Sequence, residues 1–214
     1  MSVVRTHVGE PVFKFMINLI EDNTEMNYRI YNSEFIANNV GMIRYESNFH
    51  YAKYRKLFKD SERGSTWDYG VYNIFSLASG STLFYQIYKE LLFVIKDYLK
   101  DQSSLDDYSN NVWFQSWLNY HKQNEVLDWH NHFFPIHGYI SIDPKDSTTE
   151  FKEYSIKNKI GNIYIGLGYR EHRVVVDTPY DGSRITLAFN VATPKTIISG
   201  EGEEHFISFI PIII

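Results

Sequence analysis

Three of the chain's eight histidines fall in one short stretch, which runs from Trp129 to Tyr139 and reads WHNHFFPIHGY. His130 and His132 are separated by a single residue, so they project from the same side if the stretch is a β-strand, because successive strand side chains alternate between faces. Two imidazoles placed in this way can chelate a transition metal. Histidines also pack among aromatic side chains without any metal. The pair by itself therefore leaves a metal site and a polar patch in the core both open.

Composition narrows the chemistry that these histidines can support. The chain contains no cysteine, which excludes disulfides, thiolate zinc sites, iron–sulfur clusters and cysteine nucleophiles. Any metal must therefore be held by nitrogen and oxygen. The formal net charge of -5 offers no basic field for a phosphate backbone. We therefore expect no nucleic-acid partner.

Length and hydrophobicity indicate one ordinary globular domain, spanning residues 1–214. The chain is 43% hydrophobic and 22% charged, which is enough apolar material to bury a sizeable core. The N-terminal segment MSVVRTHVGEPVFKF lacks the unbroken apolar run of a secretory signal, and no apolar run reaches the length that crosses a membrane. We expect a cytoplasmic protein with no membrane partner.

Short apolar runs separated by polar turns favour a β-rich architecture. Aromatic residues make up 17% of the chain, which agrees with this interpretation. One long helix is expected from Ser81 to Lys100, because an apolar stripe recurs there at helical spacing. The stripe consists of Leu83, Ile87, Leu91, Val94 and Tyr98. A weaker helix is expected at residues 48–59, and a flanking strand at residues 12–20.

From residue 111 onward the pattern changes to strands. The expected strands are VWFQSWLNYH, WHNHFFPIHGYISI, GNIYIGLG, HRVVVD and RITLAFNVA. Such a series indicates a sandwich or a barrel. We expect residues 111–196 to form the catalytic core, residues 1–110 to add flanking strands and supporting helices, and residues 197–214 to end in an apolar strand. The segment FISFIPIII at residues 206–214 must be covered by the core or by a subunit contact, so a homodimer is one expectation.

Five segments, taken together in their order and spacing, carry a resemblance to a known family. They are WLN at residues 117–119, the His-x-His pair followed by HGYISIDP, STTEF at residues 147–151, the glycine-led strand ending at His172, and RITLAFN at residues 184–190. Over about residues 113–192 the sequence resembles the Fe(II)- and 2-oxoglutarate-dependent dioxygenases, in the branch near the prolyl hydroxylases and the oxygenases of marine bacteria and phages. The resemblance implies a mainly β fold with flanking helices. Its core would be a double-stranded β-helix, a jelly-roll or cupin-like barrel, supported by an N-terminal helical segment.

For the metal centre, the resemblance implies that Fe(II) is held by three catalytic histidines, His130, His132 and His172. Three protein ligands leave the remaining iron positions to 2-oxoglutarate and dioxygen. The chain departs from the family pattern at one place, because the family usually carries aspartate or glutamate where this chain has His132. Asp128 precedes His130 by two residues and shares its face if the strand extends that far, so Asp128 is the alternative second ligand.

For the cofactor, the resemblance implies that Arg184 binds the far carboxylate of 2-oxoglutarate, because the planar guanidinium pairs with a carboxylate through two hydrogen bonds. Asn119 and Tyr139 are candidates for further hydrogen bonds to this cofactor. The implied reaction hydroxylates a C–H bond of a peptidyl, amino-acid or small-metabolite substrate and releases succinate and CO2. Two alternatives stay open: a three-histidine cupin-type dioxygenase that does not use 2-oxoglutarate, and a metal-free barrel used for binding.

The other conspicuous residues are interpreted as structural. His137 begins an apolar run and is expected to fill a polar gap in the core. The tryptophans are expected in the core, since large aromatic residues on strands are usually buried; they are Trp113, Trp117 and Trp129. The histidines outside the pattern are His7, His50, His121 and His205. An acidic stretch is expected at a solvated helix end and loop; it consists of Asp97, Asp101, Asp106 and Asp107.

Overall fold

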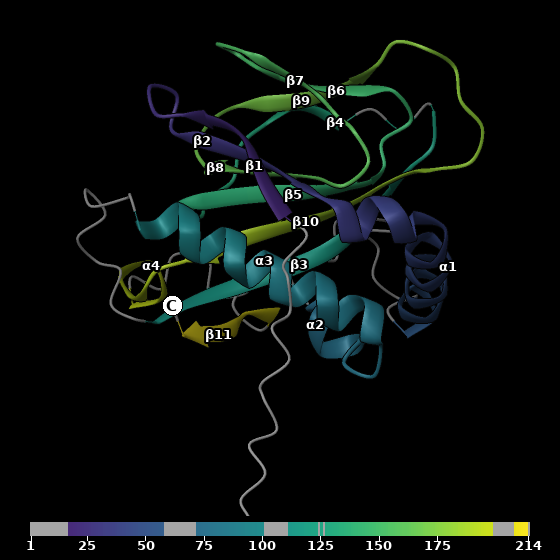
Figure 1. Ribbon diagram of the computed structural model, residues 1–214, viewed down its shortest axis with the longest axis horizontal. Helices are drawn as coiled ribbons and strands as arrows, with labels where there is room; N and C mark the ends of the chain where they lie inside the picture. Colours follow the sequence, from purple (N-terminus) through teal and green to yellow (C-terminus); the bar gives the residue numbers. More distant parts are fainter. Residues whose placement is uncertain are drawn as a thin grey trace, which may run out of the picture.

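The computed structural model describes residues 17–57, 72–100, 111–123, 125, 127–198 and 208–213. Within these ranges the chain forms two antiparallel sheets, in the strand orders β1-β2-β8-β5-β10-β3-β11 and β4-β9-β6-β7. The larger sheet comprises β1 Ile17–Asn23, β2 Tyr28–Ser33, β8 Asn162–Leu167, β5 Ile136–Asp143, β10 Arg184–Ala192, β3 Asn111–His121 and β11 Ile210–Ile213. The smaller sheet comprises β4 Leu127–His130, β9 His172–Val176, β6 Ser147–Phe151 and β7 Ser155–Lys157. The two sheets face each other (Figure 1), and the expected double-stranded β-helix with flanking helices is confirmed.

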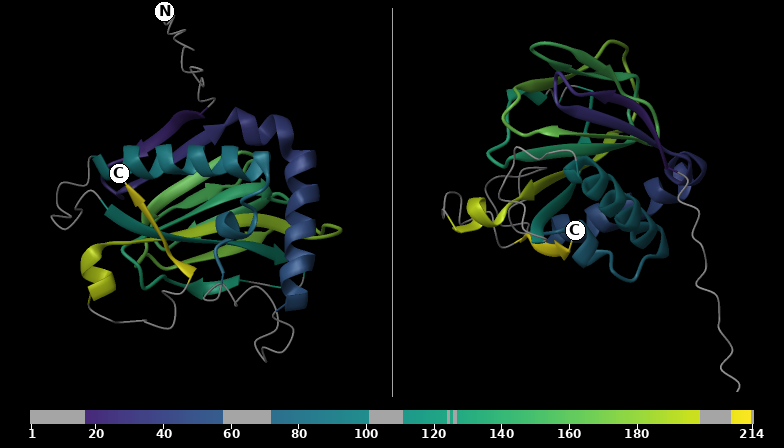
Figure 2. Two further views of the ribbon diagram at one scale, coloured as in Figure 1. Left: turned by 90° about the horizontal axis from the view of Figure 1, so that it is seen from below. Right: turned by 60° about the vertical axis from the view of Figure 1, so that its left-hand side comes forward.

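Helices cover the face of the larger sheet that points away from the smaller one (Figure 2). They are α1 Glu34–Leu57, α2 Ile74–Leu77 and α3 Thr82–Lys100, with the short α4 Pro194–Ile198 near the end of the chain. The expected helix at residues 81–100 is confirmed by α3, which buries Ile87, Leu91 and Val94 against the sheet. No helix among the described residues is long and apolar enough to cross a membrane.

The helix expected at residues 48–59 is longer than predicted, because α1 begins at Glu34. Its first half is rich in residues with low helix propensity, such as asparagine, glycine and valine, which hid it from the sequence pattern. The start is fixed by Ser33, whose Oγ accepts a hydrogen bond from the backbone N–H of Ile36 at 3.0 Å. Burial of Ile36 and Ile43 then holds the helix to the sheet. Residues 58 and 59 lie outside the described residues.

The two terminal strands have other bounds than expected within the described residues. The strand expected at residues 12–20 appears as β1 Ile17–Asn23, and residues 12–16 lie outside the described residues. The strand expected at residues 206–214 appears as β11 Ile210–Ile213, which pairs with β3 at the edge of the larger sheet. Phe209 and Ile212 are buried there, whereas Ile213 is exposed, so the core covers part of this apolar segment. Residues 206, 207 and 214 lie outside the described residues.

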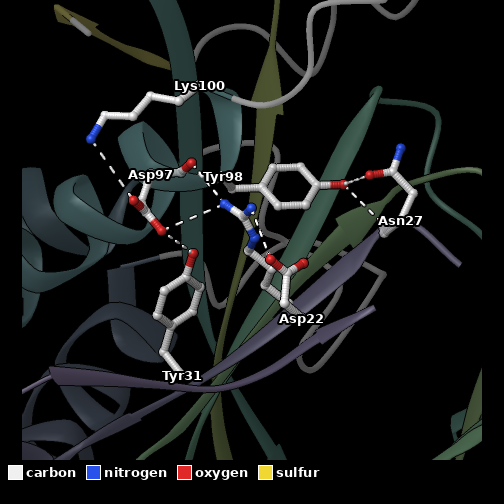
Figure 3. A network of polar contacts seen from close by, with 7 residues as sticks. Asp22, Asn27, Tyr31, Asp97, Tyr98 and Lys100 are labelled. Atoms are coloured by element: carbon white, nitrogen blue, oxygen red, sulfur yellow. Dashed lines mark hydrogen bonds and ion pairs between the residues drawn. The ribbon is translucent and has the colours of Figure 1, made fainter. Parts of the chain in front are cut away.

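A polar network fastens α3 to the strands beneath it (Figure 3). The guanidinium of Arg29, a buried residue of β2, donates to the backbone carbonyl of Asp97 at 2.9 Å and to the Asp22 carboxylate at 3.1 Å. The Tyr31 hydroxyl donates to the Asp97 carboxylate at 2.9 Å. Asp97 was expected at a solvated helix end, but it is a bridging group between α3 and β2. The helix is therefore anchored by directional contacts as well as by apolar burial.

Glu90 is a fully buried carboxylic acid on the inner side of α3. Its Oε2 accepts a hydrogen bond from Ser33, the residue that precedes α1. Burial raises the pKa of Glu90 above its ordinary value, and the hydrogen bonds from Ser33 and Gln86 offset part of this. A carboxyl whose pKa is raised by folding stabilises the fold at a pH below its unfolded pKa, and that contribution is lost as the pH rises through the folded pKa.

We therefore expect Glu90→Gln to increase the free energy of unfolding near neutral pH, because a neutral amide removes a buried charge and its oxygen keeps the hydrogen bond from Ser33. The gain should shrink as the pH falls toward about 4, near the ordinary glutamate pKa. Urea unfolding of both proteins across this range measures the difference. Glu25→Gln, at an exposed glutamate, is the matched control and should leave the free energy of unfolding nearly unchanged. A gain for Glu90→Gln that does not change with pH would contradict the account.

Candidate metal centre

Antiparallel pairing places His130 and His172 opposite each other. His130 ends β4, His172 begins β9, and the two residues are partners in the strand register. Their ring centroids lie 4.3 Å apart. One ring nitrogen from each of His130, His132 and His172 lies within 4.8 Å of the other two, so the three candidate ligands of the sequence form one cluster.

His132 reaches this cluster from a loop, so the prediction that His130 and His132 share one strand is wrong. β4 ends at His130, and the loop at residues 131–135 separates it from β5. Two backbone hydrogen bonds fasten the loop to Gly168: the His132 N–H donates to the Gly168 carbonyl at 2.8 Å, and the Gly168 N–H donates to the Pro135 carbonyl at 2.9 Å. A Cβ at Gly168 would lie 1.9 Å from the Phe134 carbonyl oxygen, so only glycine permits this approach.

Two of the three imidazoles are oriented by backbone carbonyls. The Nδ1–H of His130 donates to the Asp128 carbonyl at 2.7 Å, and the Nδ1–H of His172 donates to the Arg170 carbonyl at 3.0 Å. Each bond fixes the tautomer that leaves the lone pair on Nε2, which is how metal-binding histidines are commonly prepared. The Nε2 of His132 is buried and has no hydrogen-bond partner among the described residues. Such an unpaired nitrogen beside two oriented imidazoles fits a metal ion.

Burial keeps all three histidines neutral, which is the form that binds a metal. It lowers the pKa of His172 to about 4 and the pKa of His130 below its ordinary value. It lowers the pKa of His132 well below the ordinary value, and the neighbouring His172 and His130 lower it further. Asp128, the alternative ligand, is exposed and accepts a hydrogen bond from the N–H of Trp129 at 2.7 Å. His132, and not Asp128, completes the cluster.

The cluster opens into a cavity of about 360 Å³ between the two sheets. Four inward residues of β10 line it at alternate positions; they are Arg184, Thr186, Ala188 and Asn190. The other lining residues are Trp117, Asn119, His121, Leu127, His130, Asn131, His132, Phe133, Phe134, His137, Tyr139, Thr149, His172 and Val174. Apolar side chains and a few polar groups meet here, which is the usual make-up of a small-molecule site.

Arg184 supplies the only cation of the described residues that line this cavity. The residue is 4% exposed, and within the described ranges no carboxylate lies within 4.0 Å of its guanidinium. Burial lowers its pKa to about 10, which leaves it charged at neutral pH. A buried guanidinium without a counterion is unfavourable, so the cavity favours an anion at this place.

His121 holds the guanidinium of Arg184 in position. The two residues are cross-strand partners of β3 and β10, and Arg184 Nη2 donates to His121 Nδ1 at 2.9 Å. Burial, followed by the charge of Arg184, lowers the pKa of His121 to about 4, so the imidazole remains a neutral acceptor. The sequence interpretation had placed His121 outside the site. The usable signal was its position two residues after Asn119, on the same face of the expected strand.

Tyr139 and Asn119, the two further residues expected to contact the cofactor, also line the cavity. The Tyr139 hydroxyl is buried, and burial raises the pKa of this phenol, so it stays a proton donor. Asn119 is half-buried; its Oδ1 accepts from the Trp117 indole at 3.0 Å, and its Nδ2 lies 3.5 Å from Thr186 Oγ1. Both residues can therefore donate to an oxygen-rich ligand.

Three further residues can be compared with their expected places. Trp117 is buried, as expected, and it also lines the cavity. Trp129 is half-buried and carries the Lys152 ammonium 3.6 Å above its ring, so it packs on the outside of the smaller sheet. His137 was interpreted as a filler of a polar gap; it is buried, but it also lines the cavity and stacks on His132 with ring centroids 3.5 Å apart.

Comparison with known proteins returns solved structures only: no family model and no curated protein matches the sequence. The non-heme alpha-ketoglutarate-dependent epimerase SnoN from nogalamycin biosynthesis is 11% identical, with 78% of each chain covered and a TM-score of 0.49. HygX from Streptomyces hygroscopicus with iron bound is 10% identical, with 69% of this chain and 78% of HygX covered and a TM-score of 0.38. A cupin-2 domain protein from Shewanella frigidimarina is 16% identical, with 36% of this chain and 69% of the cupin protein covered and a TM-score of 0.30.

These likenesses are remote. The strand order and pairings described above establish the jelly-roll fold without them.

Proposed function

We propose that this protein is an Fe(II)- and 2-oxoglutarate-dependent oxygenase that hydroxylates a C–H bond of a small-molecule or peptide substrate. One observation carries the proposal: three neutral histidine nitrogens and a buried arginine without a carboxylate partner open into the same cavity. A metal and a dicarboxylate would satisfy both features together. The unpaired Nε2 of His132 and the unneutralised charge of Arg184 each need a ligand, and such a pair supplies one to each.

Each residue has a defined part in this proposal. His130, His132 and His172 hold Fe(II) through Nε2, with Nδ1 of the first and third already bonded to carbonyl oxygens. Arg184 binds the far carboxylate of 2-oxoglutarate, and Tyr139 donates a hydrogen bond to the cofactor from the cavity wall. When bound, Fe(II) and 2-oxoglutarate reduce dioxygen so that one oxygen atom enters the substrate as a hydroxyl group, the other enters succinate, and CO2 is released.

The apolar part of the lining would limit the access of water to the reacting atoms. Trp117, Phe134 and Val174 surround the histidines with hydrocarbon, while Phe133 is exposed beside them. A dry site strengthens the electrostatic contacts of the anionic cofactor and prevents loss of reactive species to water. The cavity volume is near the lower end for ligand sites, which are roughly 300–1,000 Å³, so cofactor and substrate together would fill it.

A second candidate function is a three-histidine dioxygenase that does not use 2-oxoglutarate. The observation that favours it is the donor set itself, because the cluster contains no carboxylate. In that case the organic substrate would be the anion that Arg184 binds, and it would take both oxygen atoms.

Oxygen uptake decides between the two functions. We expect the Fe(II)-loaded protein to consume dioxygen only when 2-oxoglutarate is present, and to form succinate in equal amount to the dioxygen consumed. Both quantities can be followed with an oxygen electrode and by chromatography of succinate, with 2-oxoglutarate alone or with a panel of candidate substrates. Glutarate, which lacks the keto group, is the matched control and should support no uptake. Equal uptake with no 2-oxoglutarate present would establish the second function instead.

A further inference from the structure

A row of buried polar side chains crosses the larger sheet behind the metal centre. His137 of β5 and Gln115 of β3 are both cross-strand partners of Asn190 in β10, so the three side chains lie side by side. Ser208, just before β11, extends the row. All four residues are buried, at 5%, 0%, 1% and 4% exposure for His137, Gln115, Asn190 and Ser208. Polar groups are costly to bury, so a continuous row of them calls for an explanation beyond packing.

The hydrogen bonds of this row all run in one direction. His137 Nδ1 donates to Asn190 Oδ1 at 3.3 Å, Asn190 Nδ2 donates to Gln115 Oε1 at 3.1 Å, and Gln115 Nε2 donates to Ser208 Oγ at 2.6 Å. The side-chain amides of Asn190 and Gln115 thus accept a hydrogen bond on the side toward the metal centre and donate one on the opposite side. The row fixes the proton of His137 on Nδ1 and holds the ring in one plane.

The ring of His137 lies flat against that of His132. The two planes are 11° apart, with centroids separated by 3.5 Å. His132 is the member of the cluster that comes from a loop, and its polar contact is with the side chain of Asn190, whereas His130 and His172 are oriented by backbone carbonyls of residues two positions before them. The rings of His172 and Trp117 are more distant from the His132 ring, at 5.3 Å and 6.3 Å. Stacking on His137 is therefore the closest contact that sets the plane of the His132 ring.

We propose that His137 is a positioning residue for the metal centre, held by Asn190, Gln115 and Ser208 so that its ring aims His132 Nε2 at the metal. The proposal rests on the metal centre of the proposed function, but it does not depend on 2-oxoglutarate. The proposal explains why a row of polar groups is buried here although this is unfavourable: the row supports His132, the ligand that lies in a loop. His130 and His172 lie on strands and need no such support, because backbone carbonyls orient their rings.

Co(II) alone is the probe for this proposal, since its visible absorption reports the geometry and number of its ligands. We expect His137→Ala to weaken Co(II) binding about 10- to 100-fold, the usual effect of losing a group that orients a ligand, and to change the absorption spectrum. His137→Phe keeps a flat ring in the same place, so it should recover most of the affinity and the wild-type spectrum. It should still lower the melting temperature, because Asn190 Oδ1 loses its donor. Asn190→Ser, which breaks the row at its centre, should give an intermediate loss of affinity.

Asn73→Ala is the control for a general loss of stability. Asn73 is buried, and its side chain donates to the Phe114 carbonyl at 3.0 Å, but it does not line the cavity. Its replacement should lower the melting temperature and leave the Co(II) spectrum unchanged. If His137→Ala does not fold, His137→Leu, which has volume but no flat ring, replaces it with the same expectation.

Two results would overturn the proposal. One is wild-type Co(II) affinity and spectrum in a folded variant without the ring, which would give His137 a structural role only. The other is a folded His137→Phe protein as weak as the ring-deleted variant, which would mean that stacking is not how His137 acts. Because no 2-oxoglutarate is present, failure of the proposed cofactor shows in the oxygen-uptake experiment and leaves this result unaffected.

Discussion

Replacing Arg184 with alanine is expected to raise the dissociation constant for 2-oxoglutarate about a hundredfold while metal affinity changes little. The guanidinium is buried with no carboxylate of the described chain beside it, and His121 holds it from the far side. Removing it leaves the cofactor's carboxylate desolvated and unpaired, which costs a few kcal/mol, or about two orders of magnitude in affinity. Arg184→Lys should recover only part of this loss, because an ammonium cannot pair with both carboxylate oxygens in the planar geometry of a guanidinium. Calorimetric titration of the Mn(II)-loaded proteins with 2-oxoglutarate measures the change.

The control for Arg184 is Arg44→Ala. Arg44 is half-exposed, does not line the cavity, and is paired at 3.1 Å with the buried Asp143, which Lys145 also contacts at 3.2 Å. Its replacement therefore removes an arginine from an ion pair outside the cavity and leaves Asp143 with a second cation. We expect unchanged 2-oxoglutarate binding in that variant. An Arg184→Ala protein that binds 2-oxoglutarate as tightly as wild type would show that the cofactor, if it binds, is anchored elsewhere.

His130→Ala and His172→Ala are each expected to abolish stoichiometric binding of Fe(II) or Mn(II) while the fold is retained. A methyl group cannot replace an imidazole nitrogen, and the two remaining ligands leave a weak, open site. Metal content after dialysis and calorimetry measures the loss, and circular dichroism checks the fold. His50→Ala is the matched control, because His50 is a comparably buried histidine on α1 that does not line the cavity.

Another variant tests which residue, His132 or Asp128, is the second metal ligand. Asp128→Asn should bind metal like wild type, because Asp128 is exposed and outside the histidine cluster. Loss of metal in Asp128→Asn would transfer the ligand role from His132 to Asp128. Wild-type metal affinity in either His130→Ala or His172→Ala would remove the proposed centre altogether.

The sequence predicted the elements whose side-chain pattern is strong. The helix at residues 81–100 carries an apolar stripe that fixes one buried face, and α3 follows it closely. The strands around Trp117, His172 and Leu187 are apolar and bounded by turns, and β3, β9 and β10 lie where they were expected. The facing pair His130 and His172 follows from such strands lying next to each other.

The parts that could not be predicted depend on contacts distant in sequence. The break after His130 is held by Gly168, nearly forty residues later, and alternation alone gives no sign of it. The row through His137, Asn190 and Gln115 depends on the register of three strands, and no local pattern encodes that register. His121 was passed over for the same reason: its partner Arg184 is brought to it by strand pairing.

The neutrality of the three histidines has a consequence for how the two proposed ligands bind. No carboxylate of the described chain lines the cavity, so a divalent ion would add two positive charges to that of Arg184 with nothing in the lining to cancel them. A dicarboxylate entering the cavity would compensate the ion and the arginine together, which couples the two binding events. This coupling is reciprocal: the factor by which bound 2-oxoglutarate raises the affinity for the metal equals the factor by which bound metal raises the affinity for 2-oxoglutarate. Where iron is scarce, the concentration of the dicarboxylate would then determine what fraction of the protein is loaded with metal.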